Sequence, residues 1–308
     1  MNKKRITTGI FIGMTYVGVL LLAVYVHPIF FDVFVFLLCA GGAWEMARAL
    51  SNKFSPAILI LDMISVVVGF GAFWFAQYFF KSYSAGLSGY FVSLAVMILV
   101  TVLVTAFSKT YVKGNAFTTI FVMLYPVAIL MFSMGLNYFI DLNLDWVDGS
   151  KPIRNAGLCL MFVVPALTDT MAYVVGSIFK GKKLCPSISP NKTISGAFGG
   201  LLGGLLGAGL VLLVTFLAVE FNVNLFGLAM LTDGGWTATI VNLLMLGLFG
   251  SVFDQIGDLV ASFVKRQVGI KDYSNLLPGH GGVLDRVDGF MLCGVFFYMY
   301  FAVMMLVI

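Results

Sequence analysis

Two pairs of aspartates with helical spacing stand near the end of the sequence. Asp254 and Asp258 are four residues apart and Asp285 and Asp288 are three apart, so each pair shares one face of a helix. The stretch LLPGHGG between the pairs favours a turn that makes the two helices antiparallel neighbours. Carboxylates that converge in this way repel one another unless a cation neutralises them. Hard oxygen ligands of this kind suit Mg²⁺, which shares substrate phosphate oxygens.

Four cations surround these aspartates: Lys265, Arg266, Lys271 and Arg286. They cannot be metal ligands, but they can hold phosphate groups. The alternative is that the two arginines pair with Asp272 or Asp288 in a surface network, which contributes only about 0 to 1 kcal/mol per pair. His280, between glycines, suits a phosphate donor, a general base or a turn residue. Metal, cations and carboxylates together predict chemistry on phosphate groups.

Two further polar segments lie upstream. The stretch KGKKLCPSISPNKTISG, residues 180–196, combines lysines with hydroxyl and amide donors, which suits a polyphosphate or a lipid phosphate. Its residues of interest are Ser189, Asn191, Lys192 and Thr193. A basic loop that only signals topology is the alternative. Asp169, in TDTMAY, falls inside an apolar run, where a carboxylate is a functional candidate or a hydrogen-bonded link between helices.

The elements that must position these residues are membrane-spanning helices. Of the 308 residues 60% are hydrophobic and only 10% are charged, and the mean hydropathy is +1.02. Runs of about 20 apolar residues predict nine spans. Their approximate bounds are 6–26, 30–50, 57–80, 87–107, 116–140, 156–178, 194–219, 236–263 and 289–308. The predicted fold class is therefore an all-α polytopic membrane protein.

The distribution of Lys and Arg predicts the orientation. With the N-terminus in the cytoplasm, fifteen of the eighteen fall in cytoplasmic segments, and the other three are Lys81, Lys151 and Arg154. The candidate site then faces the cytoplasm, in the C-terminal half. We expect residues 1–150 to form five N-terminal spans and 151–308 to form the catalytic spans, with cytoplasmic loops at 179–193 and 264–288.

Other features favour plain structural roles. Gly199, Gly203 and Gly207 recur every four residues in an apolar run, which predicts close helix packing rather than a phosphate loop, and no strand is expected before them. The four cysteines have no CxxC spacing and predict neither disulfides nor a zinc site. The N-terminal KKR and apolar run indicate a retained first span. The net charge of +4 is spread over membrane-adjacent loops and indicates anionic lipid, not nucleic acid, as neighbour.

At the same residues the sequence resembles the phosphatidate cytidylyltransferases, also called CDP-diacylglycerol synthases. Their signature extends over 27 positions here, from Ser262 to Asp288. The residues that fit it are Ser262, Lys265, Arg266, Lys271, Asp272, Ser274, Leu277, Pro278, His280, Gly281, Gly282, Asp285, Arg286 and Asp288. DTMAY, SPNKT and GDL upstream are also similar to the family. The family usually has Glu near Ser195 and Gly where Met171 stands, so a carboxylate role at Ser195 is in doubt.

The resemblance implies transfer of a cytidylyl group from CTP to phosphatidic acid, giving CDP-diacylglycerol and pyrophosphate. It implies Mg²⁺, with a second monovalent cation such as K⁺, on Asp258, Asp285 and Asp288. Implied catalytic residues are these three aspartates with Lys265, Arg266, Lys271 and His280. Implied substrate-binding residues are Ser189, Asn191, Lys192, Thr193, Ser262, Arg286 and Asp169.

The resemblance also implies a homodimer, and the short length without large soluble tails favours a bacterial cytoplasmic (inner) membrane enzyme of phospholipid biosynthesis. Two alternatives stay open from the residues themselves. A CTP-dependent lipid kinase would use the same groups but transfer the γ-phosphoryl group. A membrane transporter would account for nine spans and for Asp169, although no internal repeat is visible.

Overall fold

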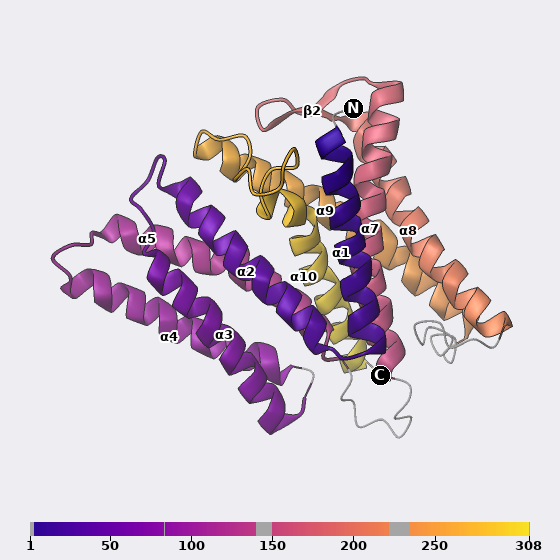
Figure 1. Cartoon of the computed structure of the whole chain (residues 1–308). Helices are drawn as coiled ribbons and strands as arrows, with labels where there is room; N and C mark the ends of the chain where they lie inside the picture. Colours follow the sequence, from indigo (N-terminus) through magenta and orange to yellow (C-terminus); the bar gives the residue numbers. More distant parts are fainter. Residues whose placement is uncertain (1–2, 83, 140–149, 222–234, 308) are drawn as a thin grey trace. The chain divides into compact units, whose positions relative to one another are not determined.

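The computed structural model describes residues 3–82, 84–139, 150–221 and 235–307. Within these ranges nine helices are long and apolar enough to cross a membrane, so the predicted all-α polytopic class is confirmed. The helices before the hairpin are α1 (Lys3–Tyr25), α2 (Ile29–Leu50), α3 (Leu59–Phe80), α4 (Ala85–Phe107), α5 (Lys113–Val122), η1 (Met123–Ala128), α6 (Ile129–Leu136) and α7 (Ser150–Phe179). After the hairpin come α8 (Ile194–Glu220), α9 (Trp236–Gln267) and α10 (Leu284–Val307), as Figure 1 shows.

Each of the nine predicted spans corresponds to one of these helices or to a continuous helical run. The fifth is the run α5–η1–α6, in which Pro126 removes a backbone donor and Tyr125 leaves helical geometry. The expected outer loops after the fifth and seventh spans fall mainly at 140–149 and 222–234, outside the described residues. Length and hydropathy alone were therefore enough to find the spans.

The chain divides into two compact units that interleave along the sequence. The first contains Met1–Val19, Ile29–Gly135 and Val264–Val287, and the second contains Leu20–Pro28, Leu136–Phe263 and Asp288–Ile308. The expected division at residue 150 stays a prediction. The segment from Val264 to Val287 belongs with the N-terminal helices, although it lies near the end of the chain.

The first unit has an aromatic core between α2, α3 and α4. Phe31, Phe73 and Tyr90 are fully buried. Gly69 and Gly86 let the rings approach, because a Cβ at Gly69 would lie 2.8 Å from the Tyr90 ring and one at Gly86 would meet Phe73. α2 joins this core through Phe36, whose ring lies 5.0 Å from that of Phe70 on α3.

The second unit depends on glycines along α8. A Cβ at Gly199 would lie 2.7 Å from the Met171 carbonyl oxygen, and Gly203 and Gly207 also face α7. Gly200 and Gly204 face α9 instead, against Gln255 and the Gly247 backbone. The predicted packing role of the glycine run is confirmed, because small residues on two faces let α8 approach two helices closely.

One expectation about this region is wrong. A strand, β2 (Ser189–Thr193), directly precedes α8 and pairs antiparallel with β1 (Lys183–Cys185). The two strands form a short hairpin beside α8 (Figure 1). The stretch shows no period-two alternation, and Pro190 is compatible with the strand because a two-stranded hairpin has only edges, which tolerate proline.

Candidate functional site

A cavity of about 520 Å³ lies in the second unit, where the hairpin meets three helices. Its walls come from α7, β2, the start of α8 and the middle of α9. The residues that line it are Asp169, Ala172, Tyr173, Gly176, Ser177, Leu184, Asn191, Lys192, Thr193, Gly196, Ala197, Gln255 and Asp258. Asp169, Asn191, Lys192, Thr193 and Asp258 of the predicted site residues are thus brought together in one cavity.

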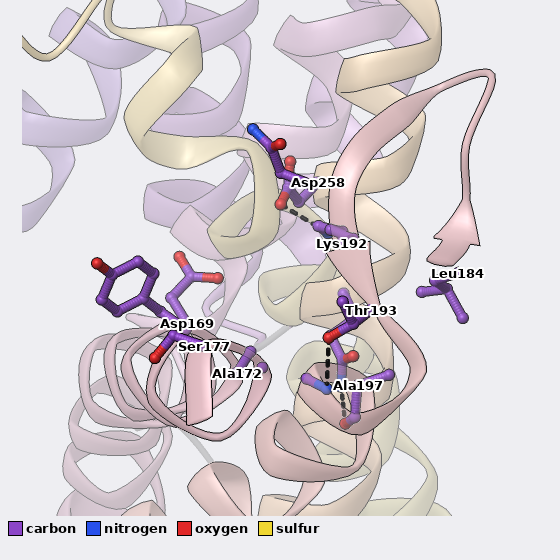
Figure 2. A pocket seen from close by; sticks show the side chains of 13 residues that line it. Asp169, Ala172, Ser177, Leu184, Lys192, Thr193, Ala197 and Asp258 are labelled. Carbon is purple, nitrogen blue, oxygen red and sulfur yellow. Dashed lines mark hydrogen bonds and ion pairs between the residues drawn. The ribbon is translucent and has the colours of Figure 1, made fainter. Parts of the chain in front are cut away.

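An ion pair joins the hairpin to α9 in this cavity. Figure 2 shows Lys192 extending from β2 toward Asp258, with 2.6 Å between Nζ and Oδ2. The other carboxylate oxygen of Asp258 accepts a hydrogen bond from Ser262 Oγ at 3.3 Å. Both charged side chains are about one quarter exposed, at 26% and 28%. The pair is therefore open to a ligand, and an incoming phosphate would compete with Asp258 for Lys192.

The N-terminus of α8 forms part of the cavity wall. Thr193 is the N-cap, and its Oγ1 accepts a hydrogen bond from the Gly196 amide at 3.1 Å. Gly196 has no room for a side chain, because a Cβ there would lie 2.9 Å from the Ala172 carbonyl oxygen. A helix N-terminus carries partial positive charge and favours anions. Lys192 and this helix end together give the cavity an anion-attracting wall.

Several acidic residues lie near Asp258, the partner of Lys192. Asp254 on α9 is 1% exposed and experiences the negative charges of Asp169, Asp288 and Asp258. Close approach of α9 and α10 makes this possible, because a Cβ at Gly257 would lie 2.5 Å from the Asp288 carbonyl oxygen. α9 and α10 thus pack closely near Asp254 and Asp288, while the expected convergence of the carboxylates on one site stays a prediction.

This acidic group fits a hard cation by its chemistry. Oδ2 of Asp254 is buried without a hydrogen-bond partner among the described residues, and a buried polar oxygen normally has one. Carboxylate oxygens suit Mg²⁺. Within the same part of the chain, however, no three His, Cys, Asp or Glu side chains already form a ready-made set of ligands. The assignment of a metal to Asp258, Asp285 and Asp288 therefore stays a prediction.

Asp285 lies in the first unit and has its own set of partners. Its Oδ1 is 2.8 Å from Lys265 Nζ, and its Oδ2 accepts hydrogen bonds from the amides of Tyr273 at 2.8 Å and Gly282 at 2.9 Å. Lys265 also lies over the Tyr273 ring, 5.4 Å from the centroid. Asp285 and Lys265 are 7% and 8% exposed. This arrangement organises the segment from α9 to α10, which we name the signature loop (residues 268–283).

The other predicted residues of the signature loop region are more open. Arg266, Lys271 and Arg286 are exposed, and Arg266 donates to the Ile270 carbonyl oxygen at 3.0 Å. The imidazole of His280 lies against Gly9 of α1, whose Cβ position is 3.5 Å from Nε2. These three cations are exposed and can therefore reach an anionic ligand.

One functional candidate was missed by the sequence analysis. Glu45 on α2 is fully buried and accepts hydrogen bonds from the signature loop and the start of α10. The available signal was a charged residue inside the second predicted span, which is a functional candidate by default. Of the remaining predicted residues, Ser189 lies on β2 and Ser262 contacts Asp258.

Comparisons with known proteins point to one family. The model of the cytidylyltransferase family matches residues 3–304. The phosphatidate cytidylyltransferase of Bacillus subtilis (strain 168) is 32% identical over 305 residues, which cover 96% of each chain. That of Brucella abortus biovar 1 (strain 9-941) is 41% identical over 171 residues, and that of Staphylococcus haemolyticus (strain JCSC1435) is 35% identical over 184. The Brucella match spans 55% of this chain and 56% of the relative, and the Staphylococcus match spans 60% of each.

The family match covers almost the whole chain, including the hairpin, the cavity and the signature loop. The full-length match to the Bacillus protein includes the N-terminal spans, for which the sequence motifs gave no specific indication. The family resemblance read from the sequence is thus confirmed, and this integral membrane protein belongs to the cytidylyltransferase family.

Proposed function

We propose that this chain is an enzyme that transfers a cytidylyl group from CTP to phosphatidic acid, giving CDP-diacylglycerol and pyrophosphate in phospholipid biosynthesis. Family membership and the names of the relatives support the reaction. The observation that carries the proposal is the cavity in which Lys192 and the N-terminus of α8 face Asp258, because it offers positive charge to phosphate in a membrane-spanning unit.

In the proposed reaction, a phosphate oxygen of phosphatidic acid attacks the α-phosphorus of CTP. The new bond joins that oxygen to the α-phosphorus, and the bond to the bridging oxygen of the β-phosphate breaks. The electron pair leaves with pyrophosphate. No covalent enzyme intermediate and no base are required, because the lipid phosphate is already anionic. The protein's contribution is positioning and charge neutralisation.

The residues divide this work by location. Lys192 would hold phosphate oxygens in the cavity, with Asn191 beside it, and the positive end of the α8 dipole would favour the bound anion. The exposed cations Arg266, Lys271 and Arg286 would neutralise nucleotide or lipid phosphates near the signature loop. Release of Lys192 from Asp258 would free the Asp258 carboxylate at the moment a phosphate binds the lysine.

We propose Mg²⁺ as cofactor, held by Asp258, Asp285 and Asp288, with a second monovalent cation such as K⁺ nearby. When bound, the metal would supply positive charge to the phosphates of the nucleotide. The carboxylate oxygens support this choice, as does the nearby Oδ2 of Asp254, which has no hydrogen-bond partner among the described residues. The metal would have to be accommodated beside the ion pairs of Asp258 and Asp285, since both carboxylates already have lysine partners.

The location and assembly of the enzyme are also proposals. The bias of Lys and Arg along the chain supports a cytoplasmic N-terminus and a cytoplasmic catalytic face. The bacterial relatives support a bacterial cytoplasmic membrane. We propose a homodimer on the family resemblance, and detergent-corrected mass measurement would test it.

The test is a labelling experiment on the purified protein in detergent with Mg²⁺ and phosphatidic acid. Label on the α-phosphate of CTP should enter the organic phase, and label on the γ-phosphate should not. The Lys192→Met variant should lose most of this activity, whereas Lys182→Met, in the same loop but outside the cavity lining, should keep it. Transfer of the γ-label would instead identify a lipid kinase. If neither label enters the lipid, the proposed reaction is refuted.

A further inference from the structure

Glu45 is a buried carboxylate that contacts two separate parts of the first unit. It lies on α2 with 0% exposure. Its Oε1 accepts hydrogen bonds from Ser274 Oγ at 2.6 Å and from the Val283 amide at 2.8 Å. Its Oε2 accepts one from the Leu284 amide at 2.9 Å. A single side chain thus joins α2 to the beginning of the signature loop and to its end.

The two amides at the end of the loop belong to the N-terminus of α10. The first amides of a helix have no partner within the helix, and a carboxylate there satisfies them and interacts favourably with the helix dipole. Glu45 supplies this cap from a different helix. It therefore determines where α10 begins relative to α2.

Glu45 and Asp285 hold the same two segments of the loop, residues 273–274 and residues 282–283. Asp285 binds the amides of Tyr273 and Gly282, and Glu45 binds the next residue along in each case, Ser274 and Val283. Consecutive residues of the loop thus donate hydrogen bonds to different carboxylates: residues 273 and 282 to Asp285, and residues 274 and 283 to Glu45. Removal of either carboxylate should therefore loosen the same part of the signature loop.

This arrangement explains the adjacent glycines at the end of the loop. Gly281 has φ +83°, and a Cβ there would lie 2.7 Å from Asp285 Oδ2. A Cβ at Gly282 would overlap the Glu45 carboxylate. The Gly281–Gly282 pair therefore passes between two carboxylates, and side chains at these positions would displace one or the other.

We infer that Glu45 is a positioning residue for the proposed reaction: it holds the signature loop and the first turn of α10 so that Asp285, Arg286 and Lys265 keep their places. The inference rests on the proposed function for its kinetic consequence. Its structural consequence is independent of activity. Misplacement of catalytic groups by about 1 Å can cost on the order of 100-fold in rate.

The test compares Glu45→Gln with Asp32→Asn in the intact protein in detergent. Asp32 is a matched control, because it is also a fully buried carboxylate of α2 and its Oδ2 accepts a hydrogen bond from Trp74 Nε1 of α3 at 3.0 Å. The glutamine keeps the shape of Glu45 but turns one acceptor into a donor that faces an amide. We expect kcat for α-label transfer to fall roughly 10- to 100-fold in Glu45→Gln, with KM for CTP within about threefold of the parent.

The second readout is the rate of trypsin cleavage after Lys271, an exposed residue of the loop. It should rise about 10-fold or more in Glu45→Gln and stay unchanged in Asp32→Asn. Ser274→Ala, which removes one of the three hydrogen bonds, should give a smaller change in the same direction and serves if Glu45→Gln does not fold. Parental kcat and parental cleavage in Glu45→Gln would overturn the inference. An inactive parent would instead refute the proposed function, and the cleavage rates would still decide whether Glu45 holds the loop.

Discussion

The buried pair of Lys265 and Asp285 gives the sharpest quantitative prediction. Both residues are less than 10% exposed, and the Asp285 carboxylate accepts three hydrogen bonds, one of them from the lysine. Asp285→Asn would leave a buried ammonium without its counter-ion and would turn one oxygen into a donor. Breaking a buried pair in this way costs about 3 to 5 kcal/mol. For a chain of this size we expect the melting temperature to fall by roughly 10 °C.

A double variant separates this structural cost from any chemical role of the carboxylate. Lys265→Met removes the uncompensated charge, so Asp285→Asn with Lys265→Met should be more stable than Asp285→Asn alone. We expect a coupling energy of about 2 kcal/mol between the two positions, because residues in direct contact are not additive. If Asp285 also takes part in the reaction, the double variant regains stability and stays inactive.

The measurement is thermal unfolding of the four proteins of the cycle in one detergent, followed by α-label transfer at a temperature where all four are folded. The reasoning would be refuted by an Asp285→Asn variant within 1 kcal/mol of the parent, or by strictly additive effects. A double variant with parental activity would show that neither residue has a chemical role and would leave the pair a purely structural device.

Three shorter predictions concern the second unit. Lys192→Met should lower kcat/KM for α-label transfer about 100-fold, since the cavity loses its paired cation, whereas Lys182→Met should change it less than twofold. Equal effects of the two variants would show that the cavity takes no part in the reaction. Gly203→Ala should destabilise the protein, because the methyl group meets the Leu167 backbone. Gly209→Ala, where nothing among the described residues lies within 4 Å, should be neutral or stabilise by up to about 1 kcal/mol, and unfolding midpoints in the opposite order would contradict the packing account. Ser195→Glu should keep activity within about threefold, since Ser195 does not line the cavity and its hydroxyl donates to the Lys180 carbonyl; loss of CTP binding would show otherwise.

The spans and the glycine packing were predictable from sequence because both depend on local patterns. A run of apolar residues has to be about 20 long to cross a bilayer, and glycines every four residues share a helix face. Neither inference needs knowledge of a distant partner. The β1–β2 hairpin was missed because its strands have three and five residues and carry no alternation of apolar and polar side chains.

The partners of the site residues were harder to predict because they come from distant segments. Lys192 pairs with Asp258, and Glu45 contacts residues more than 200 positions away. The motifs singled out Lys192 and Asp258 but gave no indication that they meet. The sequence around Glu45 showed a charge in an apolar run, which points to a buried role but not to the amides that satisfy it.

The most direct test of the central claim follows the oxygen atoms of the lipid phosphate. Phosphatidic acid with ¹⁸O in its phosphate group is incubated with CTP, Mg²⁺ and the purified protein, and both products are analysed by mass spectrometry. Attack of the lipid phosphate on the α-phosphorus predicts one pyrophosphate per CDP-diacylglycerol, with all of the ¹⁸O in the lipid product. Pyrophosphate that carries ¹⁸O, or CDP released in its place, would contradict cytidylyl transfer by this chain.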